Sequence, residues 1–316
     1  MLATFFVAYG IGSLAAGVSG LPFMEVVGKT IPAAQRGMFF AWRQTVGGLA
    51  AIGGSAFVGW LLGASSPLEF PYNFGLLFII GLSLTGMGLA SFAIVGEPPD
   101  QAVRAAASVF DQLRRATQLV RADVNYRHFV ALRIWLLLAG AATPFFAVYV
   151  QRRLGGPPEM VGTYLATYTI ASLAANVVFG RVSARWGNRR TMAIAAAAGL
   201  AMAASVVLLA VLASPLHLSG AVASLALIPV FALSGVRESG LGVAGPSLML
   251  DIAPHGERTL YLGFTHTLLG VVLLSTGLSG AVVESSGFVA LFALAAAAHV
   301  FAMGAVMRMK DVAHSQ

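Results

Sequence analysis

Two charged residues stand next to each other inside an otherwise apolar stretch of the sequence. Arg237 and Glu238 lie near the middle of the run Ser219 to Leu250. A charge at the centre of a membrane-spanning helix costs about 2.5–3.5 kcal/mol on insertion scales unless it faces protein or a water-filled cavity. An arginine can pair with an anionic group, and a glutamate can bind and release a proton. We therefore interpret the pair as a candidate site for a solute and a proton; a structural ion pair between helices is the alternative.

Three further polar residues are candidates for the same pathway. His266 follows Arg258 by about two helical turns and can titrate near neutral pH or hydrogen-bond a solute, although a packing histidine is the alternative. Thr143 and Tyr149 lie in another apolar run, beside Pro144. A proline there can loosen the helix for a gate, or can only kink it for packing.

Small residues flank the charged pair on its own helix. They are Ser234, Gly235, Ser239 and Gly242. Such small side chains leave room beside the charges, so we expect water or solute around the pair rather than a close-packed apolar seam.

Long apolar helices are needed to hold these residues. Of 316 residues, 58% are hydrophobic and 10% are charged, against about 25% charged in an average soluble domain. A membrane-spanning helix needs about 20 apolar residues, and the sequence has nine such runs. They are Leu2 to Val27, Met38 to Gly63, Tyr72 to Val95, His128 to Val150, Val161 to Phe179, Thr191 to Ala213, Ser219 to Leu250, Leu260 to Val283 and Gly287 to Met307. We predict an all-α, polytopic membrane protein with nine transmembrane helices.

The basic residues report the orientation of these helices. The net charge is +7, yet Lys and Arg fall almost entirely in one alternate set of connections and helix ends, to which Arg133 is also assigned. The opposite set holds Arg152 and Arg153. Positive residues stay on the cytoplasmic side, so we expect a multi-pass protein of a bacterial plasma (inner) membrane with a cytoplasmic C-terminus, and no nucleic-acid partner.

The sequence carries no enzyme signature. It has no cysteine, nucleophile elbow, phosphate loop, H-E-x-x-H motif or acid cluster that would hold a metal, so no catalytic residue, metal or cofactor is predicted. An intramembrane lipid-modifying enzyme is the most distant of the functional classes considered.

A polar segment and an internal repeat divide the chain. The segment from Glu97 to Tyr126 has near-helical apolar spacing with interspersed arginines, so we expect a cytoplasmic amphipathic linker over 97–126. The resulting division is a partial N-terminal half at 1–96, a six-helix half at 127–310 and a cytoplasmic tail at 311–316.

An internal repeat relates two connections of the chain. At an offset of 254 − 32 = 222, Pro32 and Arg36 match Pro254 and Arg258, and each pair lies between two long helices on the same side. Such placement indicates a parallel repeat.

One connection carries a recognisable motif. Residues 180–190 resemble the G-x-L-x-D-R-x-G-R-R/K signature of the major facilitator superfamily, matching at five positions, and Arg181 lies within the same segment. The matching residues are Gly180, Arg185, Gly187, Arg189 and Arg190. Ala184 replaces the acidic residue and Asn188 replaces the first basic one, so the motif lacks its carboxylate.

The resemblance implies a fold and a function. The chain is similar to helices four to twelve of a twelve-helix fold made of two six-helix halves. Three helices are then expected to be missing, because the sequence is a fragment, has a misassigned start or belongs to a degenerate protein. Secondary active transport of a small solute by alternating access is implied, with a proton as candidate coupling ion and the lipid bilayer as surroundings. The alternatives are a non-transporting membrane sensor or scaffold, or an inactive fragment.

Overall fold

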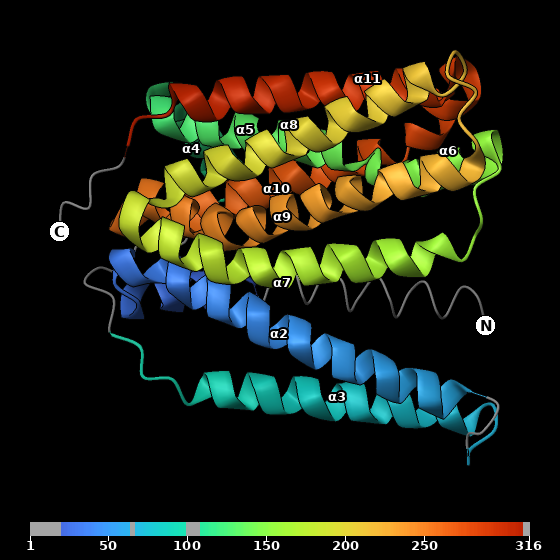
Figure 1. Cartoon of the computed structure of the whole chain (residues 1–316). Coiled ribbons are helices and arrows are strands. Elements are labelled where there is room, and N and C mark those ends of the chain that lie inside the picture. Colours follow the sequence, from blue (N-terminus) through green and yellow to red (C-terminus); the bar gives the residue numbers. More distant parts are fainter. Residues whose placement is uncertain (1–19, 64–66, 99–107, 312–316) are drawn as a thin grey trace. The chain divides into compact units, whose positions relative to one another are not determined.

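Helices make up the regular secondary structure of the described residues. The computed structural model describes residues 20–63, 67–98 and 108–311, and no strand occurs within these ranges (Figure 1). Residues 20–30 are helical. The remaining elements are α2 Ala33–Leu62, α3 Tyr72–Ala93, α4 Val109–Ala122, α5 Val124–Gly140, α6 Thr143–Leu154, α7 Met160–Trp186, α8 Asn188–Leu212, α9 Gly220–Ile252, the 3₁₀ helix η1 His255–Glu257, α10 Arg258–Thr276 and α11 Ser279–Arg308.

Eight segments among the described residues are long and apolar enough to span a membrane. They match eight of the nine predicted runs, with α5 and α6 counted as one span. Most of the ninth predicted run, Leu2 to Val27, lies outside the described residues. The prediction of an all-α, polytopic membrane protein is confirmed, whereas the number nine stays a prediction.

Two breaks in the helices differ from the sequence-based boundaries. The predicted run from His128 to Val150 is interrupted between α5 and α6, and Pro144 lies in the first turn of α6. Helix α11 begins at Ser279, which the sequence placed inside the preceding helix, and Gly287 interrupts it with φ +83°. The residues between α5 and α6 are as apolar as their neighbours, so hydropathy does not reveal that break, whereas the backbone conformations of glycine and proline permit both.

The helices form two compact units. One contains residues 1–44 and 102–316, and the other contains residues 45–101. Helix α2 contributes to both, since its first part, up to Gln44, belongs to the larger unit. The smaller unit comprises the remainder of α2 and α3. The predicted domain boundaries at 97 and 127 stay predictions.

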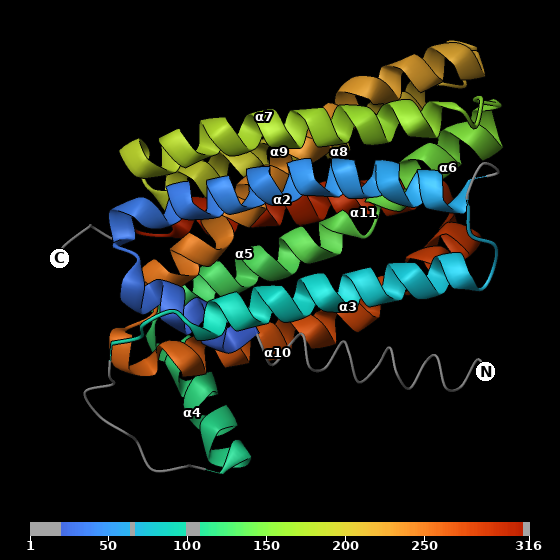
Figure 2. The ribbon, with the colours of Figure 1, turned by 90° about the horizontal axis from the view of Figure 1, so that it is seen from below.

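Helix α9 is the central helix of the larger unit. It packs along α7 and α8, and α11 packs along α5 and α8 (Figures 1 and 2). Small residues permit this contact: a Cβ on Gly235 would lie 3.0 Å from the backbone nitrogen of Ser172 on α7. The Ser239 hydroxyl donates a hydrogen bond of 2.6 Å to the Asn176 side chain, also on α7. Gly235 and Ser239 therefore form the packing seam with α7, contrary to the sequence-based expectation of open space around them.

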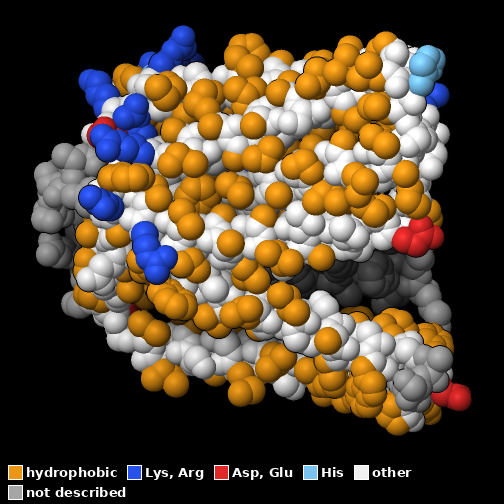
Figure 3. Space-filling view, viewed as in Figure 1, with side chains coloured by type: hydrophobic (Ala, Val, Ile, Leu, Met, Phe, Trp, Pro, Cys, Tyr) orange, Lys and Arg blue, Asp and Glu red, His pale blue; other side chains and the backbone are white. Residues whose placement is uncertain are grey.

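The larger unit has one arginine-rich end. There α5, α8 and α10 begin and α7, α9 and α11 end, and basic side chains gather there (Figure 3). They include Arg181, Arg185, Arg189, Arg190 and Arg308. Arg152 and Arg153 end α6 at the opposite, arginine-poor end. The two ends reproduce the charge asymmetry seen in the sequence.

The predicted linker contains helix α4, Val109–Ala122. Ser108 caps α4 by accepting a hydrogen bond from the Asp111 backbone N–H at 3.1 Å, and Arg115 forms an ion pair with Glu257. Residues 99–107 lie outside the described part. Tyr126, which the sequence placed in the linker, belongs to α5 and is fully buried, with its hydroxyl donating to the Tyr261 carbonyl at 3.0 Å. Its phenol ring supplies the apolar surface that brings it inside the bundle.

Candidate functional site

A cavity of about 1020 Å³ lies within the larger unit, between α5, α6, α7, α9 and α10. Four predicted site residues line it: Arg237, Glu238, His266 and Thr143. Tyr149 does not, because its hydroxyl donates to the Ala210 carbonyl at 3.4 Å and its ring packs against phenylalanines of α11. The fold thus brings together residues of α6, α9 and α10 that lie far apart in the sequence.

Arg237 is the most deeply buried charge of the cavity wall. It lies seventeen residues after Gly220 and fifteen before Ile252, close to the middle of α9. One guanidinium nitrogen, Nη2, donates to the Leu136 carbonyl at 2.7 Å, and Nη1 lies 3.5 Å from the Glu238 carboxylate. The buried Nε has no hydrogen-bond partner. A Cβ on Gly140 would lie 3.1 Å from Nη2, so this glycine lets the guanidinium reach the α5 backbone.

Glu238 faces the cavity with about half of its side chain exposed. Adjacent residues on a helix point about 100° apart, so the two side chains do not face each other squarely. The Glu238 carboxylate lies 3.5 Å from Nη1 of Arg237, which is the upper limit for a hydrogen bond. The side-chain exposures are 7% for Arg237 and 51% for Glu238. The arginine is therefore held by the protein backbone, and the carboxylate remains accessible from the cavity.

Arg133 is a site residue that the sequence-based interpretation missed. The sequence assigned it to a helix end, but it lies nine residues into α5, about 14 Å from the first residue, and lines the cavity. It makes no hydrogen bond or ion pair within the described part of the chain, and it is close enough to Glu238, Arg237 and His266 for electrostatic interaction. Its position inside an apolar run was the signal that could have identified it.

The rest of the cavity wall is mostly apolar and aromatic. The Tyr164 ring stacks on Phe231 with centroids 4.7 Å apart, and the Tyr164 hydroxyl points away, donating to the Ser224 carbonyl at 3.1 Å. The lining reaches Thr276, the last residue of α10, at the arginine-poor end. Towards the arginine-rich end it stops at His266 on this helix, eight residues after Arg258. The cavity thus reaches the arginine-poor end along α10, while along α9 its lining continues to Pro246, six residues before Ile252.

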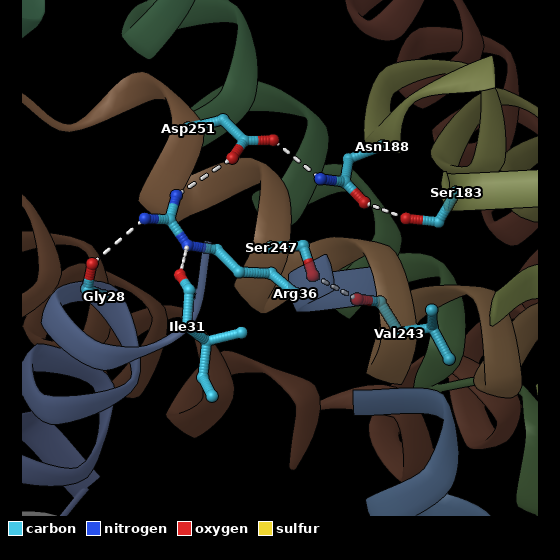
Figure 4. Close-up of polar contacts among 8 residues, drawn as sticks. All are labelled: Gly28, Ile31, Arg36, Ser183, Asn188, Val243, Ser247 and Asp251. Carbon is cyan, nitrogen blue, oxygen red and sulfur yellow. Dashed lines mark hydrogen bonds and ion pairs between the residues drawn. The ribbon is translucent and has the colours of Figure 1, made fainter. Parts of the chain in front are cut away.

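A polar network closes the arginine-rich end (Figure 4). Arg36 donates from Nη1 to Asp251 at 3.2 Å, from Nη2 to the Gly28 carbonyl at 3.0 Å and from Nε to the Ile31 carbonyl at 3.1 Å. Asn188 donates to the other Asp251 oxygen at 2.6 Å. The Ser183 hydroxyl donates to Asn188. We call Arg36, Asp251, Asn188 and Ser183 the Asp251 network; it joins the start of α2 to α7, α8 and α9.

The Asp251 network supplies the carboxylate that the motif at 180–190 lacks. Asp251 comes from α9, and Asn188, one of the two departures from the motif, binds it together with Arg36. Sequence reasoning missed Asp251, although a lone acid at the end of an apolar run, seven positions before Arg258, was a usable signal. The carboxylate is distant in sequence, so no local motif could contain it.

The other motif residues shape the surroundings of the network. A Cβ on Gly180 would lie 2.8 Å from the Ala41 side chain, so α2 and α7 pack closely there. Gly187 joins α7 to α8 with φ +85°. Arg189 holds the end of α11 through the carbonyls of Val306 and Met307, at 3.3 Å each. The side chains of Arg181, Arg185 and Arg190 are exposed and form no hydrogen bond or ion pair with the network within the described part of the chain; Arg185 lies over the Trp186 ring.

The two repeat-related arginines meet at the arginine-rich end. Arg258 is 1% exposed, and a Cβ on Gly28 would lie 2.7 Å from the central carbon of its guanidinium. Its Nε and Nη2 have no hydrogen-bond partner, while Arg36 and Asp251 are close enough for electrostatic interaction. Pro32 and Pro254 precede α2 and η1. The predicted pairing of the two inner connections therefore corresponds to one shared polar region.

Comparisons with known proteins agree on the fold. Residues 134–315 match the profile of the Major Facilitator Superfamily. A solved structure described as a bacterial homologue of the iron transporter ferroportin, in an outward-facing state, is similar with a TM-score of 0.68 and 16% sequence identity. That alignment covers 94% of this chain and 70% of the other. No curated protein sequence matches significantly.

Proposed function

Because the chain belongs to the Major Facilitator Superfamily, we propose that it carries a small solute across a bilayer as a gradient-driven secondary transporter. The observation that carries this proposal is the cavity of about 1020 Å³ with Arg237 and Glu238 in its wall, near the middle of α9. A buried charge is costly in a membrane unless it serves a partner or a pathway. Repeat-built transporters bind their solutes near this depth.

Alternating access assigns different roles to the two ends of the larger unit. Positive residues favour the cytoplasmic side, so the arginine-rich end and the C-terminus face the cytoplasm of a bacterium whose plasma membrane holds the protein. The cavity reaches the opposite end, while the Asp251 network joins helices at the cytoplasmic end. This arrangement corresponds to an outward-open conformation, and breakage of the network accompanies the change to the inward-open one.

Each polar residue of the cavity has a role in this mechanism. The guanidinium of Arg237, fixed by the Leu136 carbonyl, contacts the solute. Glu238, exposed to the cavity beside it, binds and releases the coupling proton. His266 and Thr143 line the same passage and offer hydrogen bonds.

Flux into vesicles tests this proposal. The purified chain is reconstituted, and uptake is measured for radiolabelled organic acids, amines, sugars and amino acids, with and without an imposed proton gradient. We expect saturable uptake of at least one solute, which Arg237→Gln abolishes. Glu238→Gln removes the response to the proton gradient but leaves exchange of internal for external solute.

Matched variants separate the site from general effects. Arg114→Gln and Glu284→Gln make the same changes at exposed positions outside the cavity, and both should transport as the unmodified chain does. If a monodisperse protein gives no saturable uptake of any solute, this chain does not transport by itself, and the sensor, scaffold or inactive-fragment alternatives are favoured. The assignment of Arg237 fails if Arg237→Gln and Arg114→Gln transport equally well.

A further inference from the structure

We propose that the cavity takes an amphiphilic organic anion, a small molecule with one oxyanion group such as a carboxylate and an apolar, preferably aromatic, body. The inference rests on the proposed function, because it names the class of solute for the same cavity. It follows from the charge balance of the wall, from its unpartnered donors and from the chemistry of the remaining surface.

The charged residues of the described wall leave a net positive charge. Arg133 and Arg237 contribute +2 and Glu238 contributes −1, which gives +1 with His266 neutral. A single carboxylate therefore balances only one of the two guanidinium charges, and it lies 3.5 Å from Nη1 of Arg237. In an apolar wall, an uncompensated cation is unfavourable unless an anion approaches it. A monoanionic solute would neutralise the cavity.

Donors without hydrogen-bond partners belong to residues of the cavity wall. The Nε of Arg237 and the hydroxyl of Thr143 are buried and have no hydrogen-bond partner. Arg133, which makes no hydrogen bond or ion pair within the described residues, presents a planar guanidinium with several N–H groups. Guanidinium groups bind carboxylates through paired N–H···O bonds. For a cationic solute, in contrast, the described wall offers one carboxylate as a partner. The donor set thus favours an oxyanion.

The remaining wall suits an apolar body. The stacked rings of Tyr164 and Phe231 lie on one side, and Leu269 and Leu273 of α10 also line the space. The cavity volume of about 1020 Å³ lies just above the usual range for small organic ligands, about 300–1000 Å³. Apolar surface of this extent cannot form a hydrogen bond or an ion pair with an inorganic ion, but it stabilises a hydrocarbon or aromatic group.

The same features disfavour a divalent metal ion as the solute. Among the residues that the structure describes, no group of three or more His, Cys, Asp or Glu side chains could hold a metal. Two arginines accompany Glu238, the one carboxylate of the cavity wall within the described ranges, and their charges repel a divalent cation. The solved structure of similar fold belongs to a homologue of an iron transporter, and a shared fold by itself does not imply a shared solute.

Equilibrium binding to the purified full chain tests the solute class separately from transport. Probes are matched sets built on phenyl and naphthyl groups: the carboxylates, their uncharged amides and the corresponding methylammonium cations, together with Co²⁺ as a metal probe. Binding is measured by ligand-induced thermal stabilisation and confirmed by calorimetry. A charge-assisted hydrogen bond corresponds to about tenfold or more in affinity, so we expect at least one carboxylate to bind about tenfold more tightly than its amide and its ammonium partner.

Variants assign this preference to the cavity. Arg133→Gln should reduce carboxylate affinity by about tenfold or more without changing amide affinity, Arg133→Lys should retain part of it, and Arg114→Gln should retain all of it. Tighter binding of ammonium probes or Co²⁺, equal binding of the amides, or no binding of any carboxylate would overturn the proposal. Carboxylate binding without flux would leave the solute class standing and refute transport. Saturable flux of an amine or sugar would support transport and overturn the proposed solute class.

Discussion

Replacing Asp251 by asparagine tests whether the Asp251 network holds the conformation of this structure. Asp251 accepts hydrogen bonds from Arg36 at 3.2 Å and from Asn188 at 2.6 Å. The side chains of Arg36 and Asp251 are only 7% and 10% exposed, so water screens this pair weakly. Asparagine retains one acceptor oxygen, but it loses the negative charge and the second acceptor.

The expected size of the effect follows from the hydrogen bond that this substitution removes. A hydrogen bond to a charged group contributes about 1.5–3 kcal/mol. If the network exists in only one of two interconverting conformations, losing one such bond shifts their equilibrium by about 10- to 100-fold. The closed arginine-rich end should then open more often, and the cavity should become accessible from that side.

Thiol accessibility measures this shift without a known solute. The chain contains no cysteine, so Leu269→Cys places a single thiol at a partly exposed position of the cavity wall. A membrane-impermeant thiol reagent is added to one face of oriented vesicles at a time. In the otherwise unmodified chain, labelling should be faster from the arginine-poor face. Asp251→Asn should lower that ratio of rates by about 10-fold or more, by the same hydrogen-bond estimate.

Three comparisons decide what the result means. Asp111→Asn makes the same change on exposed α4 and should leave the ratio unchanged. Arg36→Gln should reproduce the shift, and the double variant with Asp251→Asn should add little, since both residues belong to one interaction. An unchanged ratio in folded Asp251→Asn protein would refute the reasoning. A lower thermal midpoint with an unchanged ratio would show that the network only stabilises the fold.

Three other predictions follow from the same end of the molecule. Gly180→Ala should destabilise the protein by about 1–3 kcal/mol, because its methyl group would overlap α2; the thermal midpoint should fall relative to Gly263→Ala, whose methyl group meets open space, and equal midpoints would contradict the packing argument. Arg189→Gln should accelerate amide hydrogen exchange over residues 306–310, since the guanidinium no longer donates to the carbonyls at the end of α11; unchanged exchange would show that Arg189 does not hold this end. Single cysteines at Arg114 and Ala184 should both react with an impermeant thiol reagent from the cytoplasmic face only, and reaction from the outer face would reverse the proposed orientation.

The sequence alone predicted the membrane-spanning helices and the charged pair that lines the cavity. Run length and hydropathy are local properties, and they suffice because a bilayer imposes a minimum length on every spanning helix. The same argument singled out Arg237 and Glu238, since a charge in an apolar run is costly wherever the helix packs. The motif at Gly180 to Arg190 also identified the family that the profile comparison shows.

Contacts between helices were decided only by the tertiary structure. Hydropathy gives neither the rotation of a helix nor its neighbours, so Arg133 was assigned to a helix end, and Gly235 and Ser239 were expected beside open space instead of against α7. The carboxylate missing from the motif comes from Asp251, 63 positions after Asn188, which no local pattern could pair with it. Those partners depend on how distant helices meet, because a side chain's role in a bundle is set by what packs against it.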